Sequence, residues 1–253
     1  MFSVDPSDAG KHEKPDSLQT IKKGLQRRRP SQARNQSQNN QKNYERIQVL
    51  YMNVNRISIS KGNQKMGAVS SFSLPAITTC RPDAPCFKDC YAVKMERLYK
   101  NVKNAYWNNF RLLQEDPDSV FLQLKAHIMT VRFFRFHVSG DFYSYEYFVR
   151  VMDLARECNW CKFLAFTKRY EFANRYCDEG NEIPENFSLI FSAWGPDWTF
   201  PNPYNFPVSQ VVFKGDEPDP EWFICGGNCQ ECGCKGVGCW QLKKGQTIAF
   251  DKH

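Results

Sequence analysis

The chain has 253 residues, of which 42% are hydrophobic and 15% aromatic, and its formal net charge at pH 7 is +7. This length suits one large domain or two small ones, and the apolar content is enough for a sizeable core. No apolar run is long enough to cross a membrane, and the polar N-terminal stretch lacks the apolar segment of a secretory signal. These features argue against a membrane-spanning or secreted protein, and we expect a cytoplasmic one.

Residues 1–45 are rich in Lys, Arg, Gln, Asn and Ser and hold few apolar residues, so we predict a disordered basic tail. Two basic runs lie in it, at residues 22–23 and 27–29. A block of like charges is typical of a solvated tail, and it also suits an arm that touches nucleic acid. The modest positive balance of the whole chain permits contact with nucleic acid but does not require it.

The next residues mix extended and helical patterns. β-branched and aromatic residues over 47–59 predict a strand or hairpin, whereas residues 70–76 have no periodicity and are interpreted as a loop. Apolar residues then recur every three or four positions from Met95 to Leu113 and predict a helix that ends near residues 116–117. Asp118 or Ser119 is expected to cap the helix that follows.

A rhythm of strands and helices fills the middle of the chain. Strands are predicted over residues 131–138, 163–167, 187–194 and 208–213, with a helix capped by Ser144 and a short helix over 170–176. Strands that alternate with helices predict an α/β fold with a parallel sheet, and we assign residues 46–220 to such a domain.

Polar residues gather where these strands end. In parallel α/β folds ligands bind at the carboxyl ends of the strands. The candidates there are His137, Ser139, Gly140, Asp141, Thr167, Lys168, Ser192 and Trp194. Ordinary loop polarity and helix capping explain any single one of them equally well. The candidate catalytic residues are His137, Asp141 and Lys168, the first two because they flank a glycine that lets the backbone approach a ligand.

Eleven cysteines, an odd number without a secretory signal, favour metal ligands over disulfides. Cys80, Cys86 and Cys90 follow the spacing C-x5-C-x3-C. Three thiolates leave one position open in a tetrahedral zinc site, or one iron open in a [4Fe–4S] cluster. Iron and zinc cannot be told apart here, because the same thiolates serve both.

A second group of cysteines lies in residues 221–253, a Cys-rich segment that we expect to bind a metal or a cluster. Glycines between the cysteines let a short chain wrap a metal. We favour Cys225, Cys229, Cys232 and Cys239 as ligands and doubt Cys234, although spacing leaves open whether Cys234 or Cys229 and Cys232 complete the site. A four-cysteine zinc knuckle and a ferredoxin-like cluster both fit. Cys158, Cys161 and Cys177 are interpreted as packing thiols.

Several ordered motifs resemble the phage "gene product eighty-eight" family. They are SFSLPA at 71–76, Cys86 and Cys90 followed by Tyr-Ala, RFHVSGDFYSYEYF at 135–148, FLAFTK at 163–168, and Cys239 followed by Trp. In outline the pattern is also similar to radical S-adenosylmethionine enzymes, which implies a partial (β/α) barrel with parallel strands. The spacing departs from the C-x3-C-x2-C of those enzymes, and the visible β/α units are fewer than eight.

The resemblance to radical enzymes implies roles for particular residues. Cys80, Cys86 and Cys90 would hold a [4Fe–4S] cluster whose open iron binds S-adenosylmethionine. Ser139, Gly140 and Asp141 would bind the amino group of that cofactor, and the C-terminal cysteines would hold an auxiliary cluster.

These expectations combine into two hypotheses for function. The first is a radical-S-adenosylmethionine-like iron–sulfur enzyme in the host cytoplasm, served by a reductase. Its substrate is unknown, and the basic tail and the phage resemblance favour a nucleic acid or a nucleotide. The alternative is a zinc-stabilised module that binds nucleic acid or a host protein without catalysis. It explains the cysteines, but not the polar residues at several strand ends.

Overall fold

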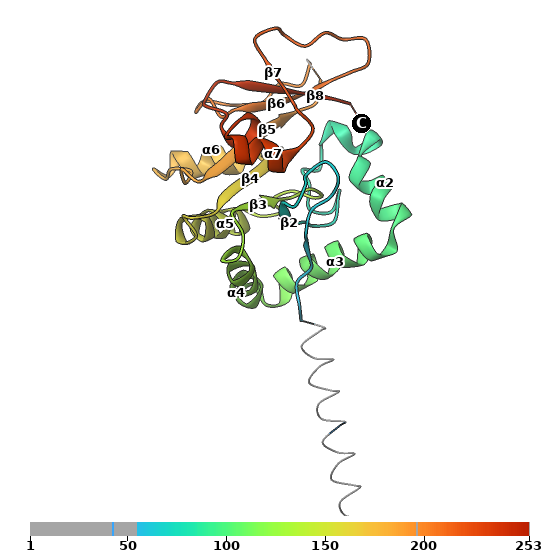
Figure 1. Ribbon diagram of the computed structural model, residues 1–253, viewed down its shortest axis with the longest axis vertical. Helices are drawn as coiled ribbons and strands as arrows, with labels where there is room; N and C mark the ends of the chain where they lie inside the picture. The colour runs from blue at the N-terminus through green and yellow to red at the C-terminus, as the bar shows by residue number, and fades with distance from the viewer. Residues whose placement is uncertain (1–41, 43–54, 196, 253) are drawn as a thin grey trace, which may run out of the picture. The chain divides into compact units, whose positions relative to one another are not determined.

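One sheet organises the residues that the computed structural model describes, which are Lys42, 55–195 and 197–252. Its strands run in the order β1-β2-β3-β4-β5-β6-β8-β7 (Figure 1). Their bounds are β1 (Ile59–Ser60), β2 (Ser70–Phe72), β3 (Phe133–Phe136), β4 (Lys162–Thr167), β5 (Phe187–Ala193), β6 (Val208–Val212), β7 (Phe223–Ile224) and β8 (Thr247–Asp251). β1 pairs with β2 antiparallel, and every other neighbouring pair is parallel.

Helices fill the connections between the first parallel strands. They are η1 (Pro85–Asp89), α2 (Tyr91–Leu98), α3 (Lys100–Glu115), α4 (Pro117–Ile128), α5 (Tyr145–Glu157) and α6 (Tyr170–Asp178). Two more helices, α7 (Cys229–Lys235) and η2 (Gly238–Trp240), lie between β7 and β8. Strands β2 to β6 are added in chain order, and right-handed crossovers then put successive helices on the same face. None of the described helices has the length and apolar character that crossing a bilayer requires.

The side chains of the central strands alternate between two cores. On β3, Phe134 and Phe136 are fully buried in the larger core, which the helices α3 to α6 cover. Phe136 and Phe163 of neighbouring strands stack with ring centroids 6.1 Å apart. Phe133 and Arg135 point to the other face, because successive residues of a strand face opposite ways.

The Cys-rich C-terminal segment covers this other face. Cys239 and Trp240 pack there with Phe133, Leu164 and Ile190 in a second, smaller core. Figure 1 shows α7, drawn in red, beside the central strands and away from the arc of α3, α4 and α5. The segment 221–252 also contributes β7 and β8, and β8 lies between β6 and β7. The two cysteine groups therefore lie on segments that are connected to the same sheet.

The predicted mixed α/β fold with a mostly parallel sheet is confirmed. The strands predicted over 131–138, 163–167, 187–194 and 208–213 correspond to β3, β4, β5 and β6. The helix predicted after Ser144 is α5, and the Ser144 side chain accepts a hydrogen bond from the Tyr147 N–H, as expected of an N-cap. The short helix predicted over 170–176 is α6.

Three local predictions were wrong. The loop predicted over 70–76 contains β2, which is too short to show a period and exists through its pairing with β1 and β3. The single helix predicted from Met95 to Leu113 is two helices, α2 and α3. They are separated by Tyr99, whose φ of −123° and ψ of 100° are extended. The cap of α4 is Asp116, which accepts from the Ser119 N–H at 3.0 Å, with Pro117 in the first helical position.

Two predictions concern residues outside the described part of the chain. The basic tail at 1–45 lies outside it except for Lys42, which is exposed. The strand or hairpin predicted over 47–59 is described only from residue 55, and β1 begins at Ile59.

Candidate functional site

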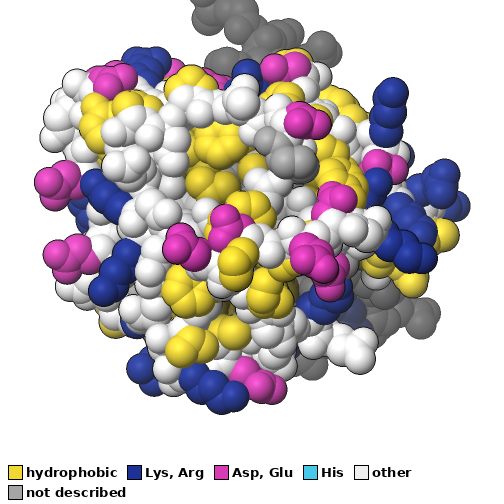
Figure 2. All heavy atoms as spheres, turned by 90° about the horizontal axis from the view of Figure 1, so that it is seen from above, with side chains coloured by type: hydrophobic (Ala, Val, Ile, Leu, Met, Phe, Trp, Pro, Cys, Tyr) yellow, Lys and Arg dark blue, Asp and Glu magenta, His cyan; other side chains and the backbone are white. Residues whose placement is uncertain are grey.

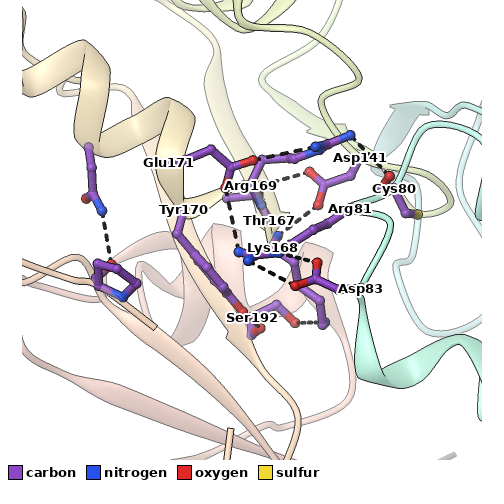
Figure 3. A network of polar contacts seen from close by, with 12 residues as sticks. Cys80, Arg81, Asp83, Asp141, Thr167, Lys168, Arg169, Tyr170, Glu171 and Ser192 are labelled. Atoms are coloured by element: carbon purple, nitrogen blue, oxygen red, sulfur yellow. Dashed lines mark hydrogen bonds and ion pairs between the residues drawn. The ribbon is translucent and has the colours of Figure 1, made fainter. Parts of the chain in front are cut away.

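Three of the predicted site elements meet at the carboxyl edge of the sheet. The loop after β2 carries Cys80, Cys86 and Cys90, the turn after β3 carries Asp141, and Lys168 follows β4 directly. We call these five residues the loop site. Figure 3 shows Asp141, Lys168 and the backbone of Cys80 within one network of polar contacts. The Arg169 guanidinium joins the strands to the loop, since it donates to the Cys80 carbonyl at 3.1 Å.

Asp141 is the buried carboxylate of the loop site, with 5% of its surface exposed. Its oxygens accept from the Thr167 hydroxyl at 2.7 Å and from the N–H groups of Phe142 and Lys168 at 2.8 Å each. Burial raises the pKa of Asp141, and these hydrogen bonds act in the opposite direction. The carboxylate therefore joins the end of β3 to the end of β4 and has little capacity left for another donor.

Gly140 makes this turn possible. Its φ is +77°, and a Cβ added there would lie 2.5 Å from Thr79 Oγ1 and 2.8 Å from the Leu74 carbonyl oxygen. Only glycine combines this backbone conformation with so close an approach. The Asp141 N–H donates to the Thr79 hydroxyl at 3.2 Å, which connects the turn to the loop that leads to Cys80.

Lys168 brings a positive charge to the cysteines. Its ammonium donates to the Ser192 hydroxyl of β5 at 2.7 Å, and its charge opposes the rise that burial causes in the pKa of Cys86. Burial raises the pKa of Cys80 to about 12, with further contributions from Asp141, Cys90 and Cys86. The loop site thus gathers three cysteine side chains, the carboxyl group of Asp141 and the ammonium group of Lys168.

The structure brings some predicted residues to the loop site and places His137 elsewhere. The His137 ring is buried between Phe136, Phe142 and Tyr147, and its Nε2 lies 3.1 Å from the Tyr147 hydroxyl. Burial lowers its pKa to about 3, so the ring is neutral at pH 7. Its φ of +59° is unusual for a residue with a side chain. The Ser139 hydroxyl donates to Glu96 Oε1 at 3.3 Å.

The C-terminal cysteines surround a cavity on the other face of the sheet. Cys225, Cys229, Cys232 and Cys239, which we call the cavity site, line a volume of about 240 Å³. Cys229 and Cys232 are three residues apart in α7 and share one face of that helix, whereas Cys234 is exposed. The four favoured cysteines are thus brought together, and Cys234 is not among the residues that line the cavity.

Local sequence explains how α7 is held. Asn228 caps the helix by accepting from the Glu231 N–H at 3.1 Å, and Gly236 ends it in a left-handed conformation. The Trp240 indole donates to the Cys229 carbonyl at 2.8 Å while its ring packs on Phe133 at 5.1 Å. These contacts fix the cysteines against the sheet.

The side chains of the cavity site are not arranged around a metal ion in the described residues. Within residues 55–195 and 197–252, no group of three or more Cys, His, Asp or Glu side chains is arranged so that it could hold a metal ion. A tetrahedral zinc site with Zn–S bonds near 2.3 Å needs its sulfur atoms about 3.8 Å apart. Besides the four cysteines and several apolar residues, Arg135 and Asn228 line the cavity.

Sequence reasoning missed three charged residues of these sites. Arg169 holds the Cys80 loop, and Glu96 Oε1 accepts from the Ala76 N–H at 2.7 Å. Arg135 lines the cavity site from β3. Only Arg135 had a signal in the sequence, which is a charged residue in the middle of a strand rich in phenylalanine.

One face of the molecule can be compared with the predicted contact to nucleic acid. On the face that Figure 2 shows, apolar and acidic side chains occupy the centre, and Lys and Arg side chains lie towards the margin. A surface that binds the phosphate backbone needs clustered basic side chains. This face therefore does not provide a basic interface.

Comparison with known proteins places the chain among phage proteins. It is 30% identical over 155 residues to the "Gene 88 protein" of Mycobacterium phage D29 and equally to that of Mycobacterium phage L5. Each match covers 55% of this chain and 63%, less than two thirds, of the relative. No solved structure matches. The family model for Gene product 88 matches residues 24–247, and the chain therefore belongs to the Gene product 88 family.

Proposed function

We propose that this chain is an iron–sulfur enzyme in which Cys80, Cys86 and Cys90 hold a [4Fe–4S] cluster at the carboxyl edge of the sheet. The observation that carries the proposal is the loop site itself. Three thiols from one loop lie within electrostatic reach of one another and of residues that follow the next two parallel strands. Three ligands leave one iron open, and a cluster there would supply single electrons to a bound cofactor or substrate.

Strand order supports a partial (β/α) barrel of the radical-S-adenosylmethionine type. Strands β2 to β6 follow one another in chain order, all parallel, and helices occupy the first three connections. Doubly wound sheets instead reverse their order at a switch point. The end strands β1 and β7 each have one partner among the described residues, so the sheet is not closed there.

The residues around the cysteines take distinct roles in this proposal. Lys168 offers its ammonium to the carboxylate of S-adenosylmethionine or to another anionic group, and Ser192 holds it in place. Asp141 acts as a positioning residue, because its hydrogen bonds fix the turn after β3 and the backbone of Lys168. The backbone of the turn at Ser139 and Gly140 is the candidate contact for the cofactor's amino group. His137 supports the turn from within the aromatic core.

The deciding experiment is anaerobic purification followed by iron, sulfide and zinc analysis, with S-adenosylmethionine cleavage measured in the presence of a reductant. We expect iron and sulfide for two clusters, and cleavage activity. Cys86→Ala should abolish cleavage and remove about half of the iron, whereas Cys234→Ala, at an exposed cysteine that does not line the cavity, should change neither. A protein that holds only zinc would refute the proposal and favour a zinc-stabilised binding module.

A further inference from the structure

We propose that Arg135 is an integral part of the cavity site, where its guanidinium neutralises an anionic metal–thiolate centre held by Cys225, Cys229, Cys232 and Cys239. This inference rests on the part of the proposed function that places a metal centre among these cysteines. It adds a residue that has neither a thiol nor a carboxylate and therefore coordinates no metal itself.

Geometry puts the guanidinium in the cavity. Arg135 pairs with Ser71 of β2 and Leu164 of β4, so it lies inside the parallel sheet and not at its edge. Its side chain faces the same side as Phe133, towards the C-terminal segment, and lines the same cavity as the four cysteines. Its Cζ lies 4.9 Å from the centre of the Phe166 ring, and this stacking fixes the plane of the guanidinium.

The charge of Arg135 has no carboxylate partner among the described residues. None of the salt bridges of that part of the chain includes it, and its Nε is buried without a hydrogen-bond partner. Arg135 is half-buried, and its Nε, buried without a hydrogen-bond partner, is a polar group whose burial is unfavourable. The cavity that Arg135 lines has no Asp or Glu in its lining, and Cys225, Cys229, Cys232 and Cys239 line it instead.

Charge balance identifies the missing partner. Four thiolates contribute −4, and either a zinc ion or an oxidised [4Fe–4S] core contributes +2, which leaves a centre of −2. The apolar residues that line the cavity, among them Phe166, Ile248 and Phe250, supply no counter-charge. A guanidinium that lines the same cavity supplies a positive charge and hydrogen-bond donors, which are the interactions that tune such centres.

The test uses the full chain with Cys80, Cys86 and Cys90 replaced by Ser, so that only the cavity site can hold metal. In this background we compare Arg135→Gln and Arg135→Lys with the matched control Arg132→Gln. Arg132 stacks on Phe133, with Cζ 5.5 Å from the ring, and does not line the cavity. Each variant is reconstituted anaerobically with ferrous iron and sulfide, and separately with zinc, and the loss of metal to a chelator is followed.

We expect Arg135→Gln to lose its centre about 10- to 100-fold faster than the parent, as replacement of a residue that supports metal ligands does. The rate of metal loss from Arg135→Lys should lie between the rates of the parent and of Arg135→Gln. Arg132→Gln should lose metal at the same rate as the parent. A cluster that persists in Arg135→Lys should also show a lower reduction potential, by up to about 59 mV for a tenfold change in a one-electron equilibrium. Thermal unfolding of the metal-free variants shows whether a substitution disrupts folding itself. If Arg135→Gln does so, metal retention in Arg135→Lys, which keeps the positive charge, tests the inference instead.

Two results would overturn the inference. They are equal retention of metal in Arg135→Gln and Arg132→Gln, and the absence of any metal centre on these cysteines in the parent. A further result would refute the proposed function without refuting this inference. If only zinc is retained and its retention depends on Arg135, the inference stands and the iron–sulfur enzyme is excluded.

Discussion

The carboxylate of Asp141 and the hydroxyl of Thr167, which are 26 residues apart in the chain, form a buried hydrogen bond of 2.7 Å. The bond joins the turn after β3 to the last residue of β4. The same hydroxyl accepts from the Arg169 N–H at 2.9 Å, and Arg169 holds the Cys80 loop. One threonine thus connects three segments of the loop site.

Thr167→Val should destabilise the fold by about 1–3 kcal/mol, because it leaves a buried carboxylate short of one donor at nearly unchanged volume. The control is Thr130→Val, which removes an exposed hydroxyl bonded to the His127 carbonyl and should cost less than about 0.5 kcal/mol. Urea unfolding of the metal-free proteins measures both. Equal costs would mean that the Asp141–Thr167 bond contributes little.

Gly140→Ala should destabilise the protein more than Gly180→Ala. Both glycines have positive φ, of 77° and 84°, so each substitution strains the backbone by about 1–3 kcal/mol. Only at Gly140 would the new Cβ also meet Thr79 and Leu74, whereas no atom lies within 4 Å at Gly180. The overlap should add about 1–3 kcal/mol. The difference between the two midpoints of urea unfolding isolates the overlap, and identical midpoints would contradict it.

His137 should make the protein sensitive to acid. Its pKa in the folded state is about 3, below the ordinary value of 6.5, so protonation favours the unfolded chain between these values. The stability that neutral His137 contributes is complete above pH 6.5 and is lost towards pH 3, by up to about 1.4 kcal/mol per pH unit. Burial raises the pKa of Asp141, which acts in the opposite sense.

The comparison with His137→Asn isolates the histidine, because Asp141 is present in both proteins. Asparagine tolerates a positive φ, so the backbone at this position is not strained further. The difference in unfolding free energy between the two proteins should therefore change with pH from 6.5 downwards. Two parallel stability curves across this range would show that His137 does not titrate on unfolding.

Lys168→Met should weaken S-adenosylmethionine binding about 10-fold or more, because the residue supplies the ammonium of the loop site. Lys168→Arg should retain most of the affinity. Lys162→Met is the matched control, since Lys162 begins β4, the strand that Lys168 follows, and so lies at the opposite edge of the sheet. Equilibrium binding to the reconstituted protein measures all three. Similar affinity in the two methionine variants would remove Lys168 from the cofactor site.

Patterns with a local cause could be recognised in the sequence. The strands β3 to β6 are runs of β-branched and aromatic residues, and Ser144 carries the cap signal of α5, so each was predicted near its observed bounds. Three-residue β2 could not be recognised in this way, because its neighbour β3 begins some sixty residues later. Strands β7 and β8 were missed because they are defined by pairing, β8 with β6 and β7 with β8.

The sequence by itself determined the spacing of the two cysteine groups and the position of the glycine before Asp141. Its alternation of strand and helix patterns also predicted the parallel α/β sheet. Tertiary structure alone decided which of these residues meet. It placed His137 among the rings of Phe136, Phe142 and Tyr147, Lys168 near Cys86, and Arg135 in the cavity site. The physical reason is that local propensity sets where a strand begins and ends, whereas the neighbours of a side chain depend on strand order and on the face to which it points.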